Sequence, residues 1–161
     1  MKKTNLSEHS ATFSKANKYK IGIVVSEWNP TITNALKEGA LFTLLNHGVI
    51  EANVAIHQVP GSFELPLGAS MLLDADDELD GVICLGCVIQ GETRHFDFIS
   101  QAVANGAMRV GLDYEVPVVF GVLTCDTMEQ AMDRSGGKHG NKGVEAAYTV
   151  LKMIELQRKL K

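Results

Sequence analysis

Two polar stretches of the sequence combine residue types that can transfer protons and bind anions. The first, GETRHFD (Gly91 to Asp97), directly follows an apolar run, VICLGCVI, and a glutamine. If a helix starts at Thr93, its free backbone amides and partial positive charge offer an anion site, which a phosphate would suit. His95 would then stand close enough to exchange a proton with the bound group. The alternative is a well-capped helix with solvent-exposed charges, and this stretch alone favours neither interpretation.

The second stretch, RSGGKHGNKG (Arg134 to Gly143), combines glycines with cations of two kinds. It lacks the G-K-[ST] ending of a Walker A loop and the strand-then-G-x-G-x-x-G context of a dinucleotide site. By itself it is typical of a flexible surface loop. Arg134, however, supplies a planar fork of donors and Lys142 a point charge. Together these two cations can clamp a phosphate and polarise a carbonyl or ring oxygen.

Two further side chains lie where an apolar run gives way to a loop or a helix. Trp28, the only tryptophan, is either a core residue or a platform on which a planar ring can stack. Glu64, within VPGSFELP, lies at a predicted helix start. A carboxylate there either complements the helix dipole or accepts hydrogen bonds from sugar hydroxyls.

The remaining histidines and the cysteines predict no metal or redox site. His139 has no second His or Cys at metal-ligand spacing, and His47 and His57 stand alone in a helix end and a strand. Cys84 and Cys87 form a C-x-x-C pair, but they lie inside a predicted strand, where residues three apart point to opposite faces. We therefore expect buried thiols at these two positions.

The apolar segments that must position these residues recur along the chain. They are almost continuously apolar, as expected of strands covered on both faces, and amphipathic helices separate them. This alternation predicts the fold class α/β: a three-layer flavodoxin-like sandwich, with a four-stranded parallel sheet and helices on both faces. The predicted strands are Lys20–Ser26, Asn53–Val59, Gly81–Ile89 and Pro117–Thr124.

Start and stop signals bound the predicted helices. Ligands of such sheets bind beyond the carboxyl ends of the strands, so the loops after the four strands are expected to form the site. An N-cap at Asn29 and a C′ stop at Gly48 bound the first helix. The others are Phe63–Leu73 with Pro66 in its first turn, Thr93–Gly111, a short helix opened by Asp126 with Glu129, and Gly143–Leu160.

Composition restricts the class of protein. The 161 residues fit one globular domain, and we predict a mobile N-terminal arm at residues 1–18 and a single domain at residues 19–161. The net charge of −4 argues against nucleic acid as a partner. The apolar runs are far shorter than the roughly 20 residues that cross a membrane, and the N-terminus lacks a secretory h-region. Three cysteines, an odd number, favour reduced thiols and a cytoplasmic location.

Taken together, the loops resemble those of the lumazine synthase family of riboflavin biosynthesis. The combination of G-E-T-x-H-F-D with G-x-K-x-G-N-K-G is highly specific. The matching blocks keep the family's order from Tyr19 to the last helix, so only the arm lies outside the resemblance. These blocks are IGIVVSEWNPTITNALKEGA, VPGSFELP, LGCVIQGETRHFDFIS, PVVFGVLT and MDRSGGKHGNKGVEAA.

The resemblance implies a transferase that needs no cofactor and no metal. It would condense 5-amino-6-(D-ribitylamino)uracil with 3,4-dihydroxy-2-butanone 4-phosphate to give 6,7-dimethyl-8-ribityllumazine, phosphate and water, the penultimate step of riboflavin biosynthesis. The alternatives are a non-catalytic flavin- or lumazine-binding module and a shell-forming scaffold with a vestigial site. A simple binder does not need the proton-transfer group that His95 supplies.

The family's site residues carry over onto matching positions of this sequence. His95 would move protons, Arg134 would bind the phosphate and Lys142 would orient the substrate. Trp28 would stack on the pyrimidine. The remaining contacts would come from the backbone of Ser62 and Phe63 and the carboxylate of Glu64 for the ribityl chain, Val88 and Ile89 for the ring, Gly91, Glu92 and Thr93 for the phosphate end, and Phe120.

Glu92 is the one implied contact whose charge opposes its role. Its carboxylate would repel a phosphate if the side chain faced into the site. We therefore expect the backbone amide to make the contact, while the carboxylate turns to solvent or to Arg94.

The resemblance also implies an oligomer. Family sites lie at the subunit interfaces of a homopentamer, so Phe120, Arg134 and Lys142 would come from the neighbouring subunit. Many members build an icosahedral capsid of sixty subunits from twelve pentamers, and the Gly-rich loop carries no insertion that resembles a shell-blocking variant. Riboflavin synthase is a candidate partner.

Overall fold

The strands assemble into one parallel sheet in the order β2-β1-β3-β4, the order of flavodoxin-like folds. The computed structural model describes residue 7, residues 12–13 and residues 15–161; the other residues of the predicted arm lie outside this range. The predicted α/β fold with four parallel strands is confirmed. The strands are β1 (Ile21–Ser26), β2 (Val54–Val59), β3 (Gly81–Ile89) and β4 (Val118–Cys125).

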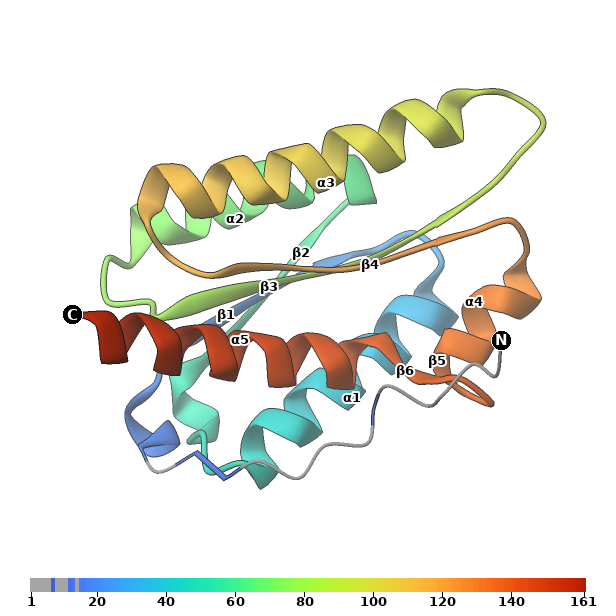
Figure 1. Cartoon of the computed structure of the whole chain (residues 1–161). Helices are drawn as coiled ribbons and strands as arrows, with labels where there is room; N and C mark the ends of the chain where they lie inside the picture. The colour runs from blue at the N-terminus through green and yellow to red at the C-terminus, as the bar shows by residue number, and fades with distance from the viewer. Residues whose placement is uncertain (1–6, 8–11, 14) are drawn as a thin grey trace.

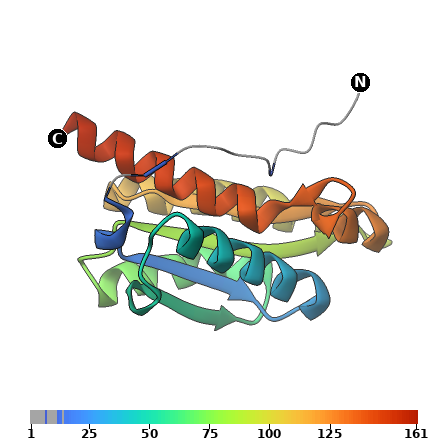
Figure 2. The same ribbon diagram turned by 90° about the horizontal axis from the view of Figure 1, so that it is seen from below.

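Helices cover both faces of the sheet, which gives three layers (Figures 1 and 2). One face carries α2 (Leu65–Ala75) and α3 (His95–Tyr114), and the other carries α1 (Pro30–Asn46) and α5 (Lys142–Leu160). The short α4 (Met128–Arg134) follows β4 and leads into a hairpin of β5 (Ser135–Gly137) and β6 (Gly140–Asn141). Short 3-10 turns cover Ala16–Lys18, Glu51–Asn53 and Ser62–Glu64. Within the described part of the chain, no helix is both long enough and apolar enough to span a membrane.

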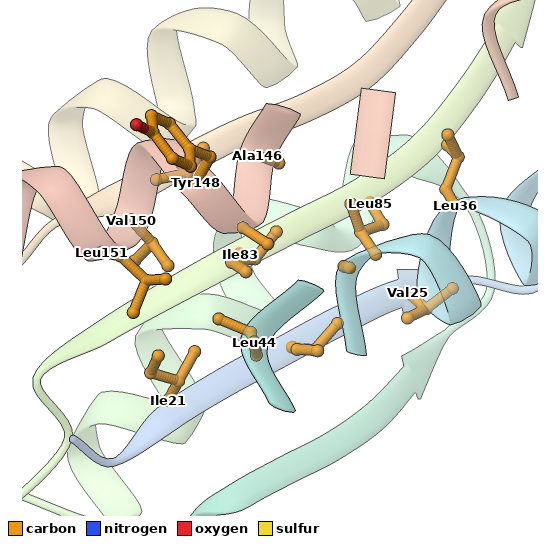
Figure 3. Close-up of a cluster of buried hydrophobic side chains, with 14 of the residues drawn as sticks. Ile21, Val25, Leu36, Leu44, Ile83, Leu85, Ala146, Tyr148, Val150 and Leu151 are labelled. Carbon is orange, nitrogen blue, oxygen red and sulfur yellow. The ribbon is translucent and has the colours of Figure 1, made fainter. Parts of the chain in front are cut away.

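The larger of two apolar cores lies between the sheet and the α1–α5 layer. Figure 3 shows side chains of β1 and β3, such as Ile21 and Ile83, pointing toward Leu44 of α1 and Leu151 of α5. Alternate residues of the same strands, such as Val24 and Cys84, enter the second core under α2 and α3. Because both faces of the central strands β1 and β3 are covered, these two strands read as continuous apolar runs. The expected coverage of both faces is wrong for β2, an edge strand in which Ile56, His57 and Gln58 are exposed.

The described end of the predicted arm packs on the larger core. Phe13 is buried, and its ring meets those of His47 and Tyr148 edge-on, at centroid distances of 5.3 and 5.5 Å. Ala16 is buried beside it. The division of the chain after residue 18 stays a prediction.

Strand positions match the sequence-based expectations within one residue, whereas two predicted helix caps, at Thr93 and Asp126, are wrong, and a third is right only in its position. Asn29 precedes α1 as expected, but its side chain does not cap the helix. The third helix begins at His95 rather than at Thr93, although the Thr93 hydroxyl accepts a 3.4 Å hydrogen bond from the His95 amide. The fourth helix is capped by Thr127, whose hydroxyl accepts the Gln130 amide at 3.2 Å, and not by Asp126. The C′ glycine, Gly48, is confirmed by its φ of 94°.

The C-x-x-C pair lies on opposite faces of β3, as the spacing predicts. Cys84 enters the core under α2 and α3, and Cys87 enters the core under α1 and α5. All three cysteines are free and buried. Burial raises the pKa of both Cys84 and Cys87 to about 12, with a further contribution from Cys125 at Cys87. These two thiols therefore stay protonated at every physiological pH.

We expect the folded protein to leave Cys84 and Cys87 unmodified by a thiol reagent at pH 8, whereas the denatured chain exposes all three cysteines.

The raised pKa of these two thiols also makes the stability of the fold depend on pH. Above the ordinary thiol pKa of 9.0, Cys84 and Cys87 ionise only in the unfolded chain. The free energy of unfolding that these thiols contribute below pH 9 is therefore lost as the pH rises toward 12. Thiol titration and denaturant unfolding at several pH values test both statements, with a Cys84→Ala/Cys87→Ala variant as control. Rapid labelling of either thiol in the folded protein would contradict the first.

A glycine lets α5 approach α1 at backbone contact distance. A Cβ at Gly143 would overlap the carbonyl oxygen of Leu36 and lie 2.7 Å from its carbonyl carbon. Since the obstacle is main chain, no side-chain rotation relieves it. Gly143→Ala should therefore cost at least the about 1–3 kcal/mol typical of overpacking, measured as a lower denaturation midpoint. Gly91→Ala is the matched control, because a Cβ there meets no atom within 4 Å; an equal loss in both variants would contradict the argument.

Candidate active site

The loops that follow the strands meet at the carboxyl edge of the sheet, as expected for this class of fold. Backbone hydrogen bonds continue past the strand ends and fix the loops to one another. The amides of Glu27 and Trp28 donate to the carbonyls of Val59 and Pro60 at 2.9 and 3.2 Å. On the other side of β3, the amide of Gln90 donates to Cys125 at 2.9 Å.

Trp28 lies outside both cores. Its side chain is 65% exposed, so packing in a core is excluded for this residue. The indole lies against Gly61, where a Cβ would come within 2.7 Å of the ring atoms Cε3 and Cζ3. The glycine therefore leaves one side of the ring resting on backbone, and an exposed aromatic ring at the edge of a sheet is suited to stacking on a planar ligand.

The loop after β2 forms a tight turn whose own side chains stabilise it. One carboxylate oxygen of Glu64 accepts the amide of Gly61 at 3.0 Å, and the buried hydroxyl of Ser62 donates to the carbonyl of Cys87 at 3.5 Å. Phe63 is exposed between them. The second oxygen of Glu64 accepts no hydrogen bond within the described residues, so this carboxylate can still accept one from a ligand.

The last two residues of β3 lie on opposite faces of the sheet. Val88 packs partly on the core under α2 and α3, and Ile89 packs partly on the other core. Both are half-buried at the strand end that leads to the polar stretch.

The polar stretch after β3 is open to solvent. Gly91, Glu92, Thr93, Arg94 and His95 are all exposed, and the imidazole of His95 makes no hydrogen bond to the described residues. The start of α3 lies beyond the carboxyl end of β3, where a helix can bind an anion, although the amides of His95 and Asp97 already donate to the Thr93 hydroxyl and the Arg94 carbonyl. The Arg94 guanidinium lies 3.5 Å from the carboxylate of Asp97. Glu92 is exposed and forms no ion pair with Arg94, so whether its carboxylate turns away from the site stays a prediction.

Two of the three cations of the Gly-rich stretch, Arg134 and Lys142, converge on one buried carboxylate, while Lys138 pairs with Asp133. Arg134 donates to both oxygens of Glu145, at 2.9 and 3.2 Å, and to the carbonyl of His139 at 2.7 Å. The ammonium group of Lys142 lies 3.1 Å from the same carboxylate, which is only 8% exposed. Burial raises the pKa of the nearby Cys125 thiol, and the Arg134 charge partly offsets this.

Glu145 is the site residue that the sequence analysis missed. Its spacing of three residues from Lys142 on α5 is a signal that could have suggested that pair. Its contact with Arg134 could not be read from the sequence, since the hairpin between them has to fold back first. The sequence favoured a flexible loop here, but the chain forms a short antiparallel hairpin.

Asn141 closes this hairpin and starts α5. Its side-chain oxygen accepts the amides of Gly143 and Val144 at 2.8 and 3.3 Å, and its amide group donates to Ala35 and Ser135 at 2.9 and 3.1 Å. One side chain therefore joins α1, the hairpin and the first turn of α5. The positions of Lys142 and Glu145 follow from this junction.

The structure gathers the predicted site residues into two groups. The first lies around Trp28 and the loops after β2 and β3, and the second is the cation pair on Glu145. Across the described residues, no hydrogen bond or ion pair joins one group to the other. No set of three His, Cys, Asp or Glu side chains in the described part of the chain is arranged to hold a metal ion.

Phe120 lies with Lys142 on a groove of about 640 Å³ along the free edge of β4. The walls of the groove come from α3 and α5 and are mainly apolar. They include the exposed side chains of Met108 and Leu112 on α3 and of Leu156 on α5.

The fold and the position of the site define a flavodoxin-like α/β protein whose candidate site lies beyond the carboxyl ends of its strands. Residues 18–158 match the family model described as 6,7-dimethyl-8-ribityllumazine synthase, and the chain belongs to this family.

Relatives with that same name are similar to the chain over most of its length. A protein of Cytophaga hutchinsonii is 57% identical over 150 residues, which cover 93% of this chain and 94% of the relative. One of Parabacteroides distasonis is 50% identical over 151 residues, with coverage of 93% and 94%. One of Christiangramia forsetii is 44% identical over 158 residues, with coverage of 98% and 94%.

Proposed function

We propose that this chain condenses 5-amino-6-(D-ribitylamino)uracil with 3,4-dihydroxy-2-butanone 4-phosphate to give 6,7-dimethyl-8-ribityllumazine, phosphate and water. The observation that carries the proposal is the meeting of three features at one edge of the sheet. These are an exposed aromatic ring, a histidine whose ring makes no hydrogen bond to the described residues, and the start of α3. Membership of the family supports the same reaction.

The reaction consists largely of proton transfers. An amine adds to a ketone to form a carbinolamine, which loses water; phosphate is then eliminated and the second ring closes. A histidine titrates near neutral pH and can both accept and return the protons of these steps. His95 is exposed at the first turn of α3, next to the amides proposed to hold the phosphate. We assign it the role of proton-transfer group.

The pyrimidine substrate fits the first group of residues. Its planar ring would stack on the exposed face of Trp28, between that indole and the ends of β3 at Val88 and Ile89. The ribityl hydroxyls would meet the backbone of Ser62 and Phe63 and the remaining oxygen of Glu64. The hydrogen bond from Gly61 to Glu64 supports this assignment, because it orients the carboxylate before the ligand arrives.

The phosphate fits the amides of Gly91, Glu92 and Thr93 together with the two cations. Arg134 has five N–H donors, and three hydrogen bonds to Glu145 and His139 leave two donors for a phosphate. Lys142, held by its ion pair with Glu145, would orient the substrate. Glu145 thus holds both cations in place and leaves the trio with a net positive charge.

The cations and Phe120 would serve the site of a neighbouring subunit. Among the described residues, no hydrogen bond or ion pair joins the two cations to Trp28 or His95, which supports a site completed across an interface. The apolar groove along the free edge of β4 supports this edge as the contact surface, since an uncovered edge with apolar walls favours association. We therefore propose a homopentamer, which can also assemble into a sixty-subunit shell.

The cellular setting completes the proposal. Three free cysteines support a cytoplasmic location, because oxidising compartments favour disulfides. Riboflavin synthase is the proposed partner, since it would consume the lumazine product.

An absorbance assay for lumazine formation from the two substrates tests the activity. Turnover is expected; binding of product without turnover would instead identify a binding module. Neither binding nor turnover, together with large particles, would identify a scaffold.

Size-exclusion chromatography with light scattering tests the assembly. A pentamer has five times the chain mass of 17.4 kDa, and a sixty-subunit shell has twelve times the mass of a pentamer. A monomeric but fully active protein would contradict a site shared between subunits.

A further inference from the structure

Trp28 has to hold a fixed orientation although neither core encloses its side chain. It is 65% exposed, and its contact with Gly61 supports only one side of the indole. An aromatic platform helps a reaction only when its orientation is set before the ligand binds, because any ordering on binding lowers affinity. The residues that fix the loop between β1 and α1 therefore decide how well the platform works.

Asn29, the next residue, has a conformation that few side chains tolerate. Its φ of 59° and ψ of 55° lie in the left-handed region, where asparagine is enriched among non-glycine residues. Its carbonyl accepts the amides of Ile32 and Thr33 at 2.9 and 3.0 Å, which starts the first turn of α1. The backbone of Asn29 thus turns the chain sharply between Trp28 and the helix.

The side chain of Asn29 fixes this turn to the centre of the sheet. Instead of capping α1, its Nδ2 donates to the carbonyl of Cys87 on β3 at 3.2 Å. The same carbonyl accepts the buried hydroxyl of Ser62 from the loop after β2. One carbonyl oxygen of a central strand therefore joins the two loops that carry Trp28 and its supporting glycine.

We infer that Asn29 is a positioning residue for Trp28, acting through the amide that it donates to the carbonyl of Cys87. The left-handed backbone sets the direction in which the indole leaves the strand. The side-chain hydrogen bond holds that backbone at a fixed position relative to β3. It thereby also fixes the backbone relative to Gly61, which contacts the indole. Trp28 makes the contact with the ring of the ligand; Asn29 acts only through it. The link from Trp28 to the pyrimidine rests on the proposed function, whereas the link from Asn29 to Trp28 does not.

The single tryptophan makes this link directly measurable in the assembled full-length protein. Time-resolved fluorescence anisotropy without ligand reports the local motion of the indole. Asn29→Gly keeps the left-handed backbone but removes the donor, and Asn29→Asp keeps the shape but turns a carboxylate toward the carbonyl. Asn34→Asp, on the exposed face of α1, is the matched control for an amide-to-acid change. Denaturation midpoints of all variants separate local motion from loss of fold.

We expect a larger amplitude of indole motion in both Asn29 variants and wild-type motion in Asn34→Asp. The dissociation constant for 6,7-dimethyl-8-ribityllumazine should rise about 3- to 10-fold, as for one lost hydrogen bond, with the KM of the phosphorylated substrate unchanged. Unchanged anisotropy in both Asn29 variants would overturn the inference. Increased motion with an unchanged dissociation constant would support the inference and contradict the proposed role of Trp28 in binding the pyrimidine.

Discussion

His95→Ala is expected to lower kcat by about 10²- to 10⁴-fold, the usual contribution of a general acid–base group, without abolishing turnover. The residual rate comes from the groups that hold the two substrates together, which this substitution leaves in place. Because His95 is exposed and its ring makes no hydrogen bond to the described residues, its removal should not change the fold. The KM of the phosphorylated substrate should change little.

Steady-state kinetics over a range of pH provides the measurement. The loss in His95→Ala should appear in kcat at saturating concentrations of both substrates. His57→Ala is the matched control, since His57 is exposed on β2 and has no assigned role. A His95→Ala enzyme that retains wild-type kcat would remove the histidine from the mechanism.

Arg134→Ala is expected to raise the KM of the phosphorylated substrate by about 10- to 150-fold, the equivalent of one charge-assisted hydrogen bond. Among the described residues, the substitution also leaves Glu145 with Lys142 as its one remaining cationic partner. The buried carboxylate would then bind that lysine more closely and draw it away from the substrate. Arg134→Lys should not restore binding, because the two hydrogen bonds to Glu145 and the one to His139 would use all three N–H donors of a lysine and leave none for a phosphate.

The comparison of Arg134→Ala with His95→Ala tests the division of roles between them. The arginine variant should change the KM of the phosphorylated substrate far more than the histidine variant does, and equal effects on that KM would contradict this division. Arg109→Ala is the matched control, because it removes an exposed arginine that pairs with Asp113 at 2.7 Å. Its KM values should stay at the wild-type level.

The fold could be predicted from the sequence because its signals are local. The buried strands β1 and β3 read as continuous apolar runs, and the residues on either side of each strand set the ends of β1 to β4 within one position. The opposite faces of Cys84 and Cys87 followed from the two-residue period of a strand. The order of strands and helices was sufficient for the class of sheet, and that class placed the site at the carboxyl edge.

The details that failed depend on partners distant in the chain. Asn29 has the residue type of a helix cap, but its amide instead binds the carbonyl of Cys87, 58 positions away in sequence. Glu145 reads as an ordinary acid in the first turn of a helix until the hairpin brings Arg134 to it. In both cases a polar side chain has a possible partner nearby in sequence and another that only the folded chain brings close. The sequence shows only the nearby partner.

The contact of Gly143 with the backbone of Leu36 has a consequence for how the site keeps its dimensions. Lys142 and Glu145 lie on either side of that glycine, so two peptide groups in direct contact set their depth in the molecule. Peptide groups have no rotamers and do not shrink or grow when a neighbouring core residue is exchanged. Core residues of this chain can therefore be exchanged for others of similar size while the height of Lys142 and Glu145 above the sheet remains constant.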